Sequence, residues 1–160
     1  MSQSAKTNAS SGDRKPIEGR VAVRVGEKGY RADVTLGGHE LVADEPKSMG
    51  GENDGPNPYD LLLASVGTCK AMTLRMYADR KGWYLGGVEV RLTHRRIHAR
   101  DCAECEADAG RVEVIDAEIE LHGDLSDEQR ERLLEIADRC PVHRTITSDL
   151  TIRTKLADSE

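Results

Sequence analysis

The longest patterned segment of the chain is Asn57-Pro-Tyr-Asp-Leu-Leu-Leu-Ala-Ser-Val-Gly-Thr-Cys-Lys-Ala-Met-Thr-Leu-Arg-Met-Tyr-Ala-Asp-Arg-Lys-Gly82. We expect it to form one helix that begins at Pro58, because Asn57 can cap the first turn and proline suits the first helical position. Asp60 adds a negative charge to that turn, and Gly82 is typical of a helix end. Apolar side chains occur nearly all the way round this helix, which predicts that it is buried on every side.

Segments of alternating apolar residues lie before and after this helix and predict strands. The expected strands are residues 20–25, 30–36, 39–44, 88–92 (leading into His94), 112–122 and 149–156, with a loop rich in glycine and proline over 45–58. A second helix is expected to begin at Ser126, which can form a capping box with Gln129, and to stop at Pro141 directly after Cys140. This order predicts an α+β fold built around antiparallel sheet.

The length and charge of the chain limit its class. Its 160 residues suffice for one domain, which we expect over residues 17–156, with a disordered tail over 1–16 and a short tail over 157–160. The 23 basic residues are scattered and the net charge is −6, so nucleic acid is not an expected partner. No apolar run approaches the roughly 20 residues of a membrane-spanning helix, and the N-terminus lacks the apolar core of a secretory signal. We therefore expect a cytoplasmic protein without a membrane partner.

Cys69 and Cys140 are the candidate catalytic residues, because each lies in a helical segment where an ordinary core residue would serve. In a reducing compartment the four cysteines of this chain indicate catalysis or metal binding rather than structural disulfides. Cys69 would need a nearby cation or hydrogen-bond donors to become a thiolate. Cys140, at the expected end of the second helix, would attack second with His143 as its base, since a helix C-terminus disfavours an anion. Free cysteines are also common in cores, so packing alone stays an open alternative.

Two motifs surround these cysteines. They are Gly50-Gly-Glu-Asn-Asp-Gly-Pro-Asn-Pro-Tyr-Asp-Leu-Leu-Leu-Ala-Ser-Val-Gly-Thr-Cys-Lys-Ala-Met-Thr-Leu74 and Ile136-Ala-Asp-Arg-Cys-Pro-Val-His143. Together they resemble the OsmC/Ohr family of thiol-dependent hydroperoxide reductases, in particular its OsmC-like branch, and the resemblance extends from about residue 20 to residue 156. The resemblance implies an intertwined homodimer of α+β subunits, in which two long central helices pack between antiparallel sheets and the active sites lie at the subunit interface.

The same resemblance implies roles for both cysteines. Cys69 corresponds to the peroxidatic cysteine, whose thiolate attacks an organic hydroperoxide and becomes a sulfenic acid. Cys140 corresponds to the resolving cysteine, which condenses with that sulfenic acid to a disulfide. A dithiol reductant, of the lipoyl type or a small thiol, then restores the thiols. The expected function is a thiol-dependent peroxidase of oxidative-stress defence that also accepts hydrogen peroxide less readily and needs no bound cofactor or metal.

Supporting residues differ in part from those of the family. Organic-hydroperoxide members place a glutamate where this chain has Tyr59, and the nearest acidic side chain is Asp60. Lys28 aligns with the arginine that holds the thiolate, and Arg31 lies close by in sequence. Lysine provides a point charge without the planar fork of arginine. These exchanges predict a weaker or differently directed peroxidase.

A second group of residues has the side-chain types of a zinc site. His94, His98, Cys102 and Cys105 follow the pattern H-x3-H-x3-C-x2-C. Alternation along a strand puts both histidines on one face, and the cysteine turn could close a tetrahedron. The other interpretation is that the histidines are partly exposed strand residues and the cysteines belong to a polar loop. The alternative function is therefore a non-catalytic ligand-binding or zinc-stabilised accessory module on the same scaffold.

Overall fold

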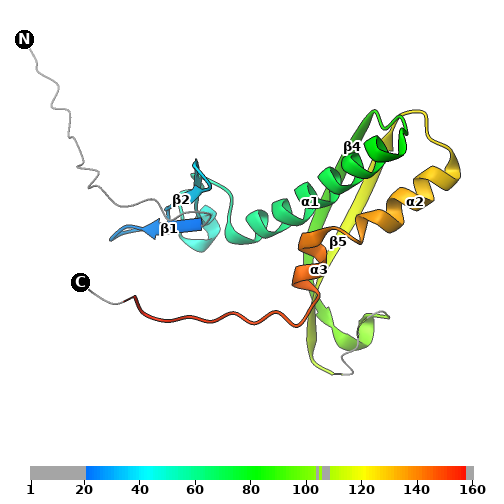
Figure 1. Ribbon diagram of the computed structural model, residues 1–160. Coiled ribbons are helices and arrows are strands. Elements are labelled where there is room, and N and C mark those ends of the chain that lie inside the picture. Colours follow the sequence, from blue (N-terminus) through cyan, green and yellow to red (C-terminus); the bar gives the residue numbers. More distant parts are fainter. Residues whose placement is uncertain (1–20, 104, 106–108, 158–160) are drawn as a thin grey trace, which may run out of the picture. The chain divides into compact units, whose positions relative to one another are not determined.

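The computed structural model describes residues 21–103, 105 and 109–157. The chain divides into two compact units, residues 1–57 and 58–160 (Figure 1). The tail predicted over residues 1–16 lies outside the described residues, as does all but the first residue of the tail predicted over 157–160.

The first unit contains a three-stranded antiparallel sheet. Its strands are β1 (Val21–Val25), β2 (Ala32–Leu36) and β3 (His39–Ala43), in the order β1-β2-β3. These strands confirm the three that alternation predicts in this region, with shifts of one or two residues at their ends. A 3₁₀ turn, η1 (Lys47–Met49), lies within the predicted loop.

The side chain of Asp44 organises the loop that follows β3. It is only 3% exposed, and its carboxylate accepts hydrogen bonds from the backbone N–H groups of Glu45 at 2.8 Å, Glu52 at 3.0 Å and Asp54 at 3.2 Å. The bond from the Asp54 N–H lowers the pKa of Asp44 most, burial opposes it, and the other two amides and the charge of Arg31 lower it further. The ionised carboxylate therefore stabilises the conformation of this loop through three backbone hydrogen bonds.

The second unit begins with the long helix that the sequence predicts. Helix α1 spans Pro58–Lys81, and Gly82 follows it with a positive φ of 68°, a conformation that favours glycine at a helix end. A long hairpin follows, made of β4 (Gly87–His98) and β5 (Arg111–His122), with a 3₁₀ turn, η2 (Ala99–Asp101), at its tip. Both strands are longer at the hairpin tip than the alternation alone predicts.

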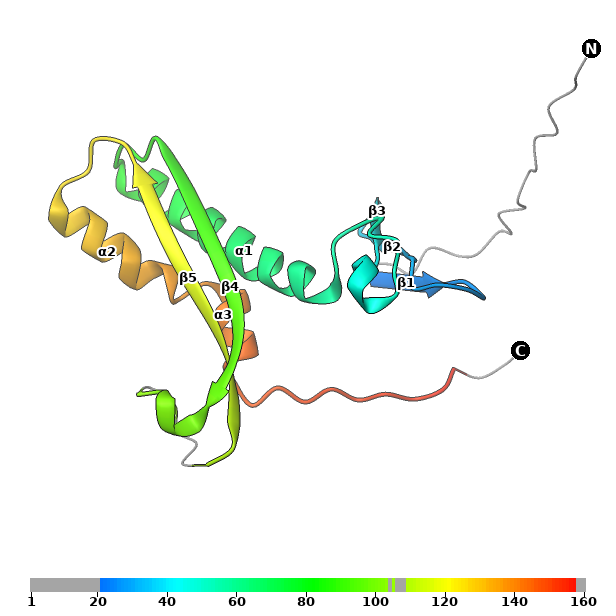
Figure 2. The same cartoon turned by 180° about the vertical axis from the view of Figure 1, so that it is seen from behind.

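Helices α1 and α2 (Asp127–Ala137) lie on the same face of the β4–β5 hairpin, as the opposite views in Figures 1 and 2 show. Gly67 allows close packing here, because a Cβ at this position would lie 2.6 Å from the Leu92 Cδ1 on β4. The core of this unit consists of Leu74, Tyr77, Ala78, Leu85, Leu125, Leu133, Ile136 and Ala137. Ser126 and Gln129 form the predicted capping box at the start of α2.

Three predictions from the sequence are wrong in detail. First, α1 is not buried on every side, since Tyr59, Met72 and Met76 are 56%, 58% and 63% exposed. Within the described part of the second unit, α1 packs mainly against β4, α2 and α3 (Pro141–Ile146), which cover one part of its surface.

The second correction concerns Cys140. Helix α2 ends at Ala137, and Pro141 starts the separate helix α3 with Cys140 as its N-cap. The physical reason is that proline fits the first position of a helix as well as it terminates one. Cys140 therefore lies at the start of a helix and not at the C-terminus of the second helix, so the argument from an unfavourable helix end does not apply.

The third correction concerns the expected last strand. Residues 149–157 are extended but form neither helix nor strand. Leu150 and Ile152 are 55% and 82% exposed, so the apolar alternation that predicts a strand is present without a partner strand in the described part of the chain. A strand forms only where its backbone groups are paired.

Candidate active site

The sulfur atoms of Cys69 and Cys140 both contact the backbone at the start of α3. The backbone N–H of Val142 donates to the Cys69 Sγ at 3.5 Å, and the next N–H, of His143, donates to the Cys140 Sγ at 3.3 Å. Two consecutive amides thus contact two cysteines that lie far apart in the sequence. Hydrogen bonds of this kind favour the thiolate form of a cysteine.

The two cysteines differ in access to solvent. Cys69 is partly exposed, whereas Cys140 is fully buried. Burial raises the pKa of the Cys140 thiol, and the His143 N–H opposes this rise. The adjacent Cys69 raises that pKa further, and the positive charge of Lys70 lowers it. The more accessible sulfur is the better placed to meet a substrate first, and the buried one to act second.

Cys69 lines an apolar hollow of about 440 Å³. Its largest apolar lining residues are Met72 and Met76 from α1, and Pro141 lines it from α3. Such a lining suits a substrate with a hydrocarbon group.

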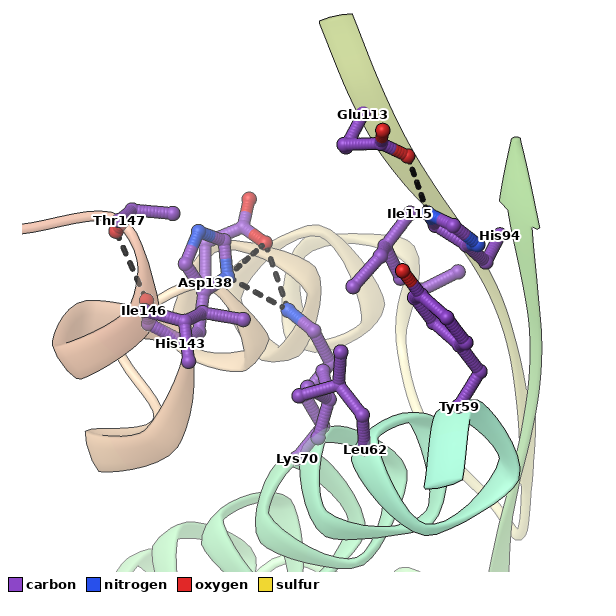
Figure 3. A pocket seen from close by; sticks show the side chains of 12 residues that line it. Tyr59, Leu62, Lys70, His94, Glu113, Ile115, Asp138, His143, Ile146 and Thr147 are labelled. Carbon is purple, nitrogen blue, oxygen red and sulfur yellow. Dashed lines mark hydrogen bonds and ion pairs between the residues drawn. The ribbon is translucent and has the colours of Figure 1, made fainter. Parts of the chain in front are cut away.

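A second cavity, of about 550 Å³, is lined by Lys70, the residue that follows Cys69, and by neither Cys69 nor Cys140. Figure 3 shows the Lys70 side chain pointing toward Asp138 and His143, with Tyr59 and His94 on the other wall. The Lys70 Nζ lies 3.0 Å from Ala137 O, 3.0 Å from Asp138 Oδ1 and 3.1 Å from His143 Nδ1. The lining residues are Tyr59, Leu62, Val66, Lys70, His94, Glu113, Ile115, Ala117, Asp138, His143, Ile146 and Thr147.

The predicted supporting residues lie in different parts of the structure. Lys28 is in the turn between β1 and β2, and Arg31 pairs with Asp54 at 3.4 Å. Both belong to the first unit, so their role at Cys69 stays a prediction. Asp60 lies in the first turn of α1. His143 contacts Cys140 through its backbone N–H, while its ring faces Lys70.

The four residues of the possible zinc site do not form a common site in the described structure, and three of them have other partners. Cys102 and Cys105 form a disulfide, with their Cα atoms 5.4 Å apart, so the expectation that none of the four cysteines forms a structural disulfide is wrong for this pair. The His94 Nε2 lies 2.7 Å from Glu113 Oε2, and its ring stacks on Tyr59 with 4.6 Å between centroids. The described residues therefore contain no tetrahedral set made of these two histidines and two cysteines.

One group of metal-type side chains does come together in the described part of the chain. Glu89, Glu120 and His122 lie close to one another on the hairpin, but all three are exposed. Arg91 already pairs with both glutamates, at 2.6 Å and 2.9 Å. This group is explained as a surface ion-pair network.

The sequence arguments overlooked Lys70. A lysine within an otherwise apolar helix, directly after a candidate nucleophile, is the signal that could have identified it. Lys70 is 4% exposed, and its partners lie on either side of Cys140 in the sequence. The charge of Lys70 lowers the pKa of the buried Cys140 thiol, so α1 itself supplies a cation to that cysteine.

The fold and the paired sulfurs define a class of small α+β proteins with a thiol pair held by α1 and α3. The sequence profile described as OsmC-like protein matches residues 51–155. The chain therefore belongs to the OsmC-like family. A search of curated proteins found no match.

Solved structures share this fold at low sequence identity. An OsmC-like protein from Mycoplasma pneumoniae has a TM-score of 0.64 and 18% identity, over 82% of this chain and 89% of that one. A protein from Psychrobacter arcticus 273-4, described as a putative osmotic stress induced and detoxification response protein, has a TM-score of 0.63 and 19% identity, over 85% and 93%. An organic hydroperoxide resistance protein OsmC from Legionella pneumophila has a TM-score of 0.58 and 20% identity, over 81% and 89%.

No helix in the described residues has the length and apolar character needed to cross a membrane.

Proposed function

We propose that this protein is a thiol-dependent peroxidase that reduces organic hydroperoxides through Cys69 and Cys140. The observation that carries the proposal is the meeting of the two sulfurs at the consecutive N–H groups of Val142 and His143. The partly exposed Cys69 and its apolar hollow support it as the residue that meets the substrate.

The reaction proceeds in three balanced steps. The Cys69 thiolate attacks one peroxide oxygen, the O–O bond breaks, and the alkoxide leaves and takes a proton to become the alcohol. Cys140 then loses its proton and its thiolate attacks the sulfenic sulfur of Cys69. The S–O bond breaks, and the leaving hydroxide combines with a proton to form water. A dithiol, of the lipoyl type or a small thiol, finally reduces the Cys69–Cys140 disulfide and is itself oxidised to a disulfide.

The test is consumption of cumene hydroperoxide by purified protein with excess dithiol. We expect turnover by the wild type, and none above the uncatalysed background by Cys69→Ser. The double variant Cys102→Ser with Cys105→Ser removes the other two cysteines and serves as the matched control. Full turnover by Cys69→Ser, or none by the wild type, would reject the proposal.

We also propose that the functional form is a homodimer in which residues 17–156 of each chain act as one domain. Its support is the exposed apolar surface of α1, at Met72 and Met76, and the exposed side chains of Leu150 and Ile152 in a segment that forms no strand among the described residues. Large exposed apolar surfaces favour association. Light scattering after size exclusion should give twice the monomer mass, and Met76→Glu should lower it; a monomer at all concentrations would refute the proposal.

A ligand-binding function without catalysis is the second candidate. The cavity of about 550 Å³ beside Lys70 favours it, because a cavity of this size, with an apolar floor and a few polar groups, suits a small molecule. The two candidates are separated by the cumene hydroperoxide assay, since a binding module needs no reaction at Cys69.

A further inference from the structure

Lys70 is a buried charged residue that the three reaction steps leave without a role. It directly follows Cys69 on α1 and is 4% exposed. Its ammonium group has three N–H donors, and the structure provides three acceptors, Ala137 O, Asp138 Oδ1 and His143 Nδ1. Each donor of the ammonium group is therefore matched by one acceptor.

These three acceptors lie on both sides of Cys140 in the sequence. Ala137 ends α2 and Asp138 is its C-cap, whereas His143 belongs to α3. Lys70 thus fastens the segment that carries Cys140 to the helix that carries Cys69. The same segment supplies the N–H groups that contact both sulfurs.

The charge of Lys70 also acts on the buried sulfur. Cys140 is fully buried, so its thiolate cannot be stabilised by solvent. The titratable groups that face it are Cys69 and Lys70 from α1 and, beyond Lys70, Asp138 and His143. Among these, Lys70 is the group whose charge lowers the pKa of Cys140.

Across the cavity, the remaining titratable groups are engaged with each other. His94 on β4 pairs with Glu113 on β5, and Arg96 also contacts Glu113, at 2.8 Å. The environment of Cys140 is therefore set chiefly by the groups around Lys70.

We propose that Lys70 is a positioning residue for disulfide closure, which holds Cys140 against Cys69 and stabilises the Cys140 thiolate as it attacks. The inference rests on the peroxidase function proposed above. In this step the Cys140 S–H bond breaks, the S–S bond forms, and the Cys69 S–O bond breaks to release water. Lys70 gives no proton to the reacting atoms and takes none from them in this step.

The test is a single-turnover reaction with cumene hydroperoxide in which both oxidised species are followed by mass spectrometry. A 1,3-dicarbonyl reagent traps the sulfenic acid of Cys69, and the disulfide is measured directly. In Lys70→Met we expect sulfenic acid to form about as fast as in the wild type but the disulfide to close about tenfold more slowly near neutral pH, because the Cys140 thiolate has lost a nearby cation. The sulfenic acid should therefore accumulate.

A merely structural role of Lys70 would leave the pH dependence of closure unchanged. We expect the rate of closure in Lys70→Met to rise only at higher pH than in the wild type, because thiolate formation has lost a nearby cation. Lys70→Arg keeps the charge and should recover the wild-type pH profile. Lys70→Gln keeps a hydrogen-bond donor but not the charge, and it replaces Lys70→Met if the methionine variant does not fold. Its rate of disulfide closure should show the same shift to higher pH as expected for Lys70→Met. Lys81→Met, at the exposed end of α1, is the matched control.

Wild-type closure rates and pH profiles in both Lys70→Met and Lys70→Gln would overturn this inference while leaving the peroxidase proposal intact. A slow closure without any change in pH profile would overturn the role of the charge. Absence of sulfenic acid in the wild type and in Cys140→Ser would instead reject the peroxidase function itself.

Discussion

Replacing Cys140 by alanine should destabilise the protein more than replacing it by serine. Cys140 is fully buried and caps α3 by accepting the His143 N–H at 3.3 Å. Both replacements lose the packing of the sulfur, which should lower the free energy of unfolding by about 1 kcal/mol, as for the loss of a buried methylene. Alanine also loses the capping acceptor, about 1 kcal/mol more, whereas serine is a preferred N-cap. The two variants should therefore differ by about 1 kcal/mol in free energy of unfolding.

The assay is urea unfolding of both variants in reducing buffer, with thermal unfolding as a second measure. For a chain of 160 residues, this difference corresponds to about 2–4 °C in Tm. The matched control is the same pair of replacements at Cys69, where the N–H contact is longer, at 3.5 Å, and the side chain is partly exposed, so a smaller difference is expected. Equal stability of the two Cys140 variants, or a more stable alanine variant, would refute the assignment of Cys140 as the N-cap.

Three further predictions concern other parts of the chain. Leu133 is fully buried, so Leu133→Ala should lower the free energy of unfolding by about 2–5 kcal/mol in urea. The Asp54 N–H lowers the pKa of Asp44. The ionised carboxylate therefore contributes its full stabilisation above the ordinary aspartate pKa, and this contribution is lost as the pH falls through the lowered pKa. The Tm of the wild type should exceed that of Asp44→Ala at neutral pH, and this difference should shrink only at acidic pH. Cys102→Ser with Cys105→Ser should leave the rate of Cys69 oxidation by hydroperoxide unchanged, as measured by trapping of the sulfenic acid.

Each of these predictions has its own contradicting result. Leu134 is adjacent to Leu133 but 59% exposed, so a loss of stability in Leu134→Ala as large as in Leu133→Ala would contradict the core assignment. A Tm difference at Asp44 that stays constant down to acidic pH would contradict its charged role. A clear fall in Cys69 oxidation when Cys102 and Cys105 are replaced would mean that the hairpin tip takes part in the thiol chemistry.

The sequence predicts α1 correctly because its signals are local. Pro58 and Gly82 act on the backbone of their own neighbourhood, and the helix begins at Pro58 and ends directly before Gly82. The capping box of Ser126 and Gln129 is equally local and is also confirmed. Such signals can be read from the sequence because they do not depend on distant contacts.

The features that the sequence misplaces depend on tertiary contacts. Pro141 is consistent with either ending or beginning a helix, and only the full fold shows that it begins α3. The alternation of residues 149–156 is real, but a strand also needs a partner, which periodicity does not reveal. Lys70 was overlooked for the same reason, since its three acceptors lie in a segment far along the chain.

The pairing of Cys69 and Cys140 is the central claim and can be tested by peptide mapping. Reduced protein is treated with one equivalent of cumene hydroperoxide, alkylated and digested without reduction. The account predicts a linked pair of peptides that contain Cys69 and Cys140, and the loss of this species in Cys140→Ser. Oxidised protein in which both of these cysteines are still alkylated, or in which Cys69 is joined only to Cys102 or Cys105, would contradict it.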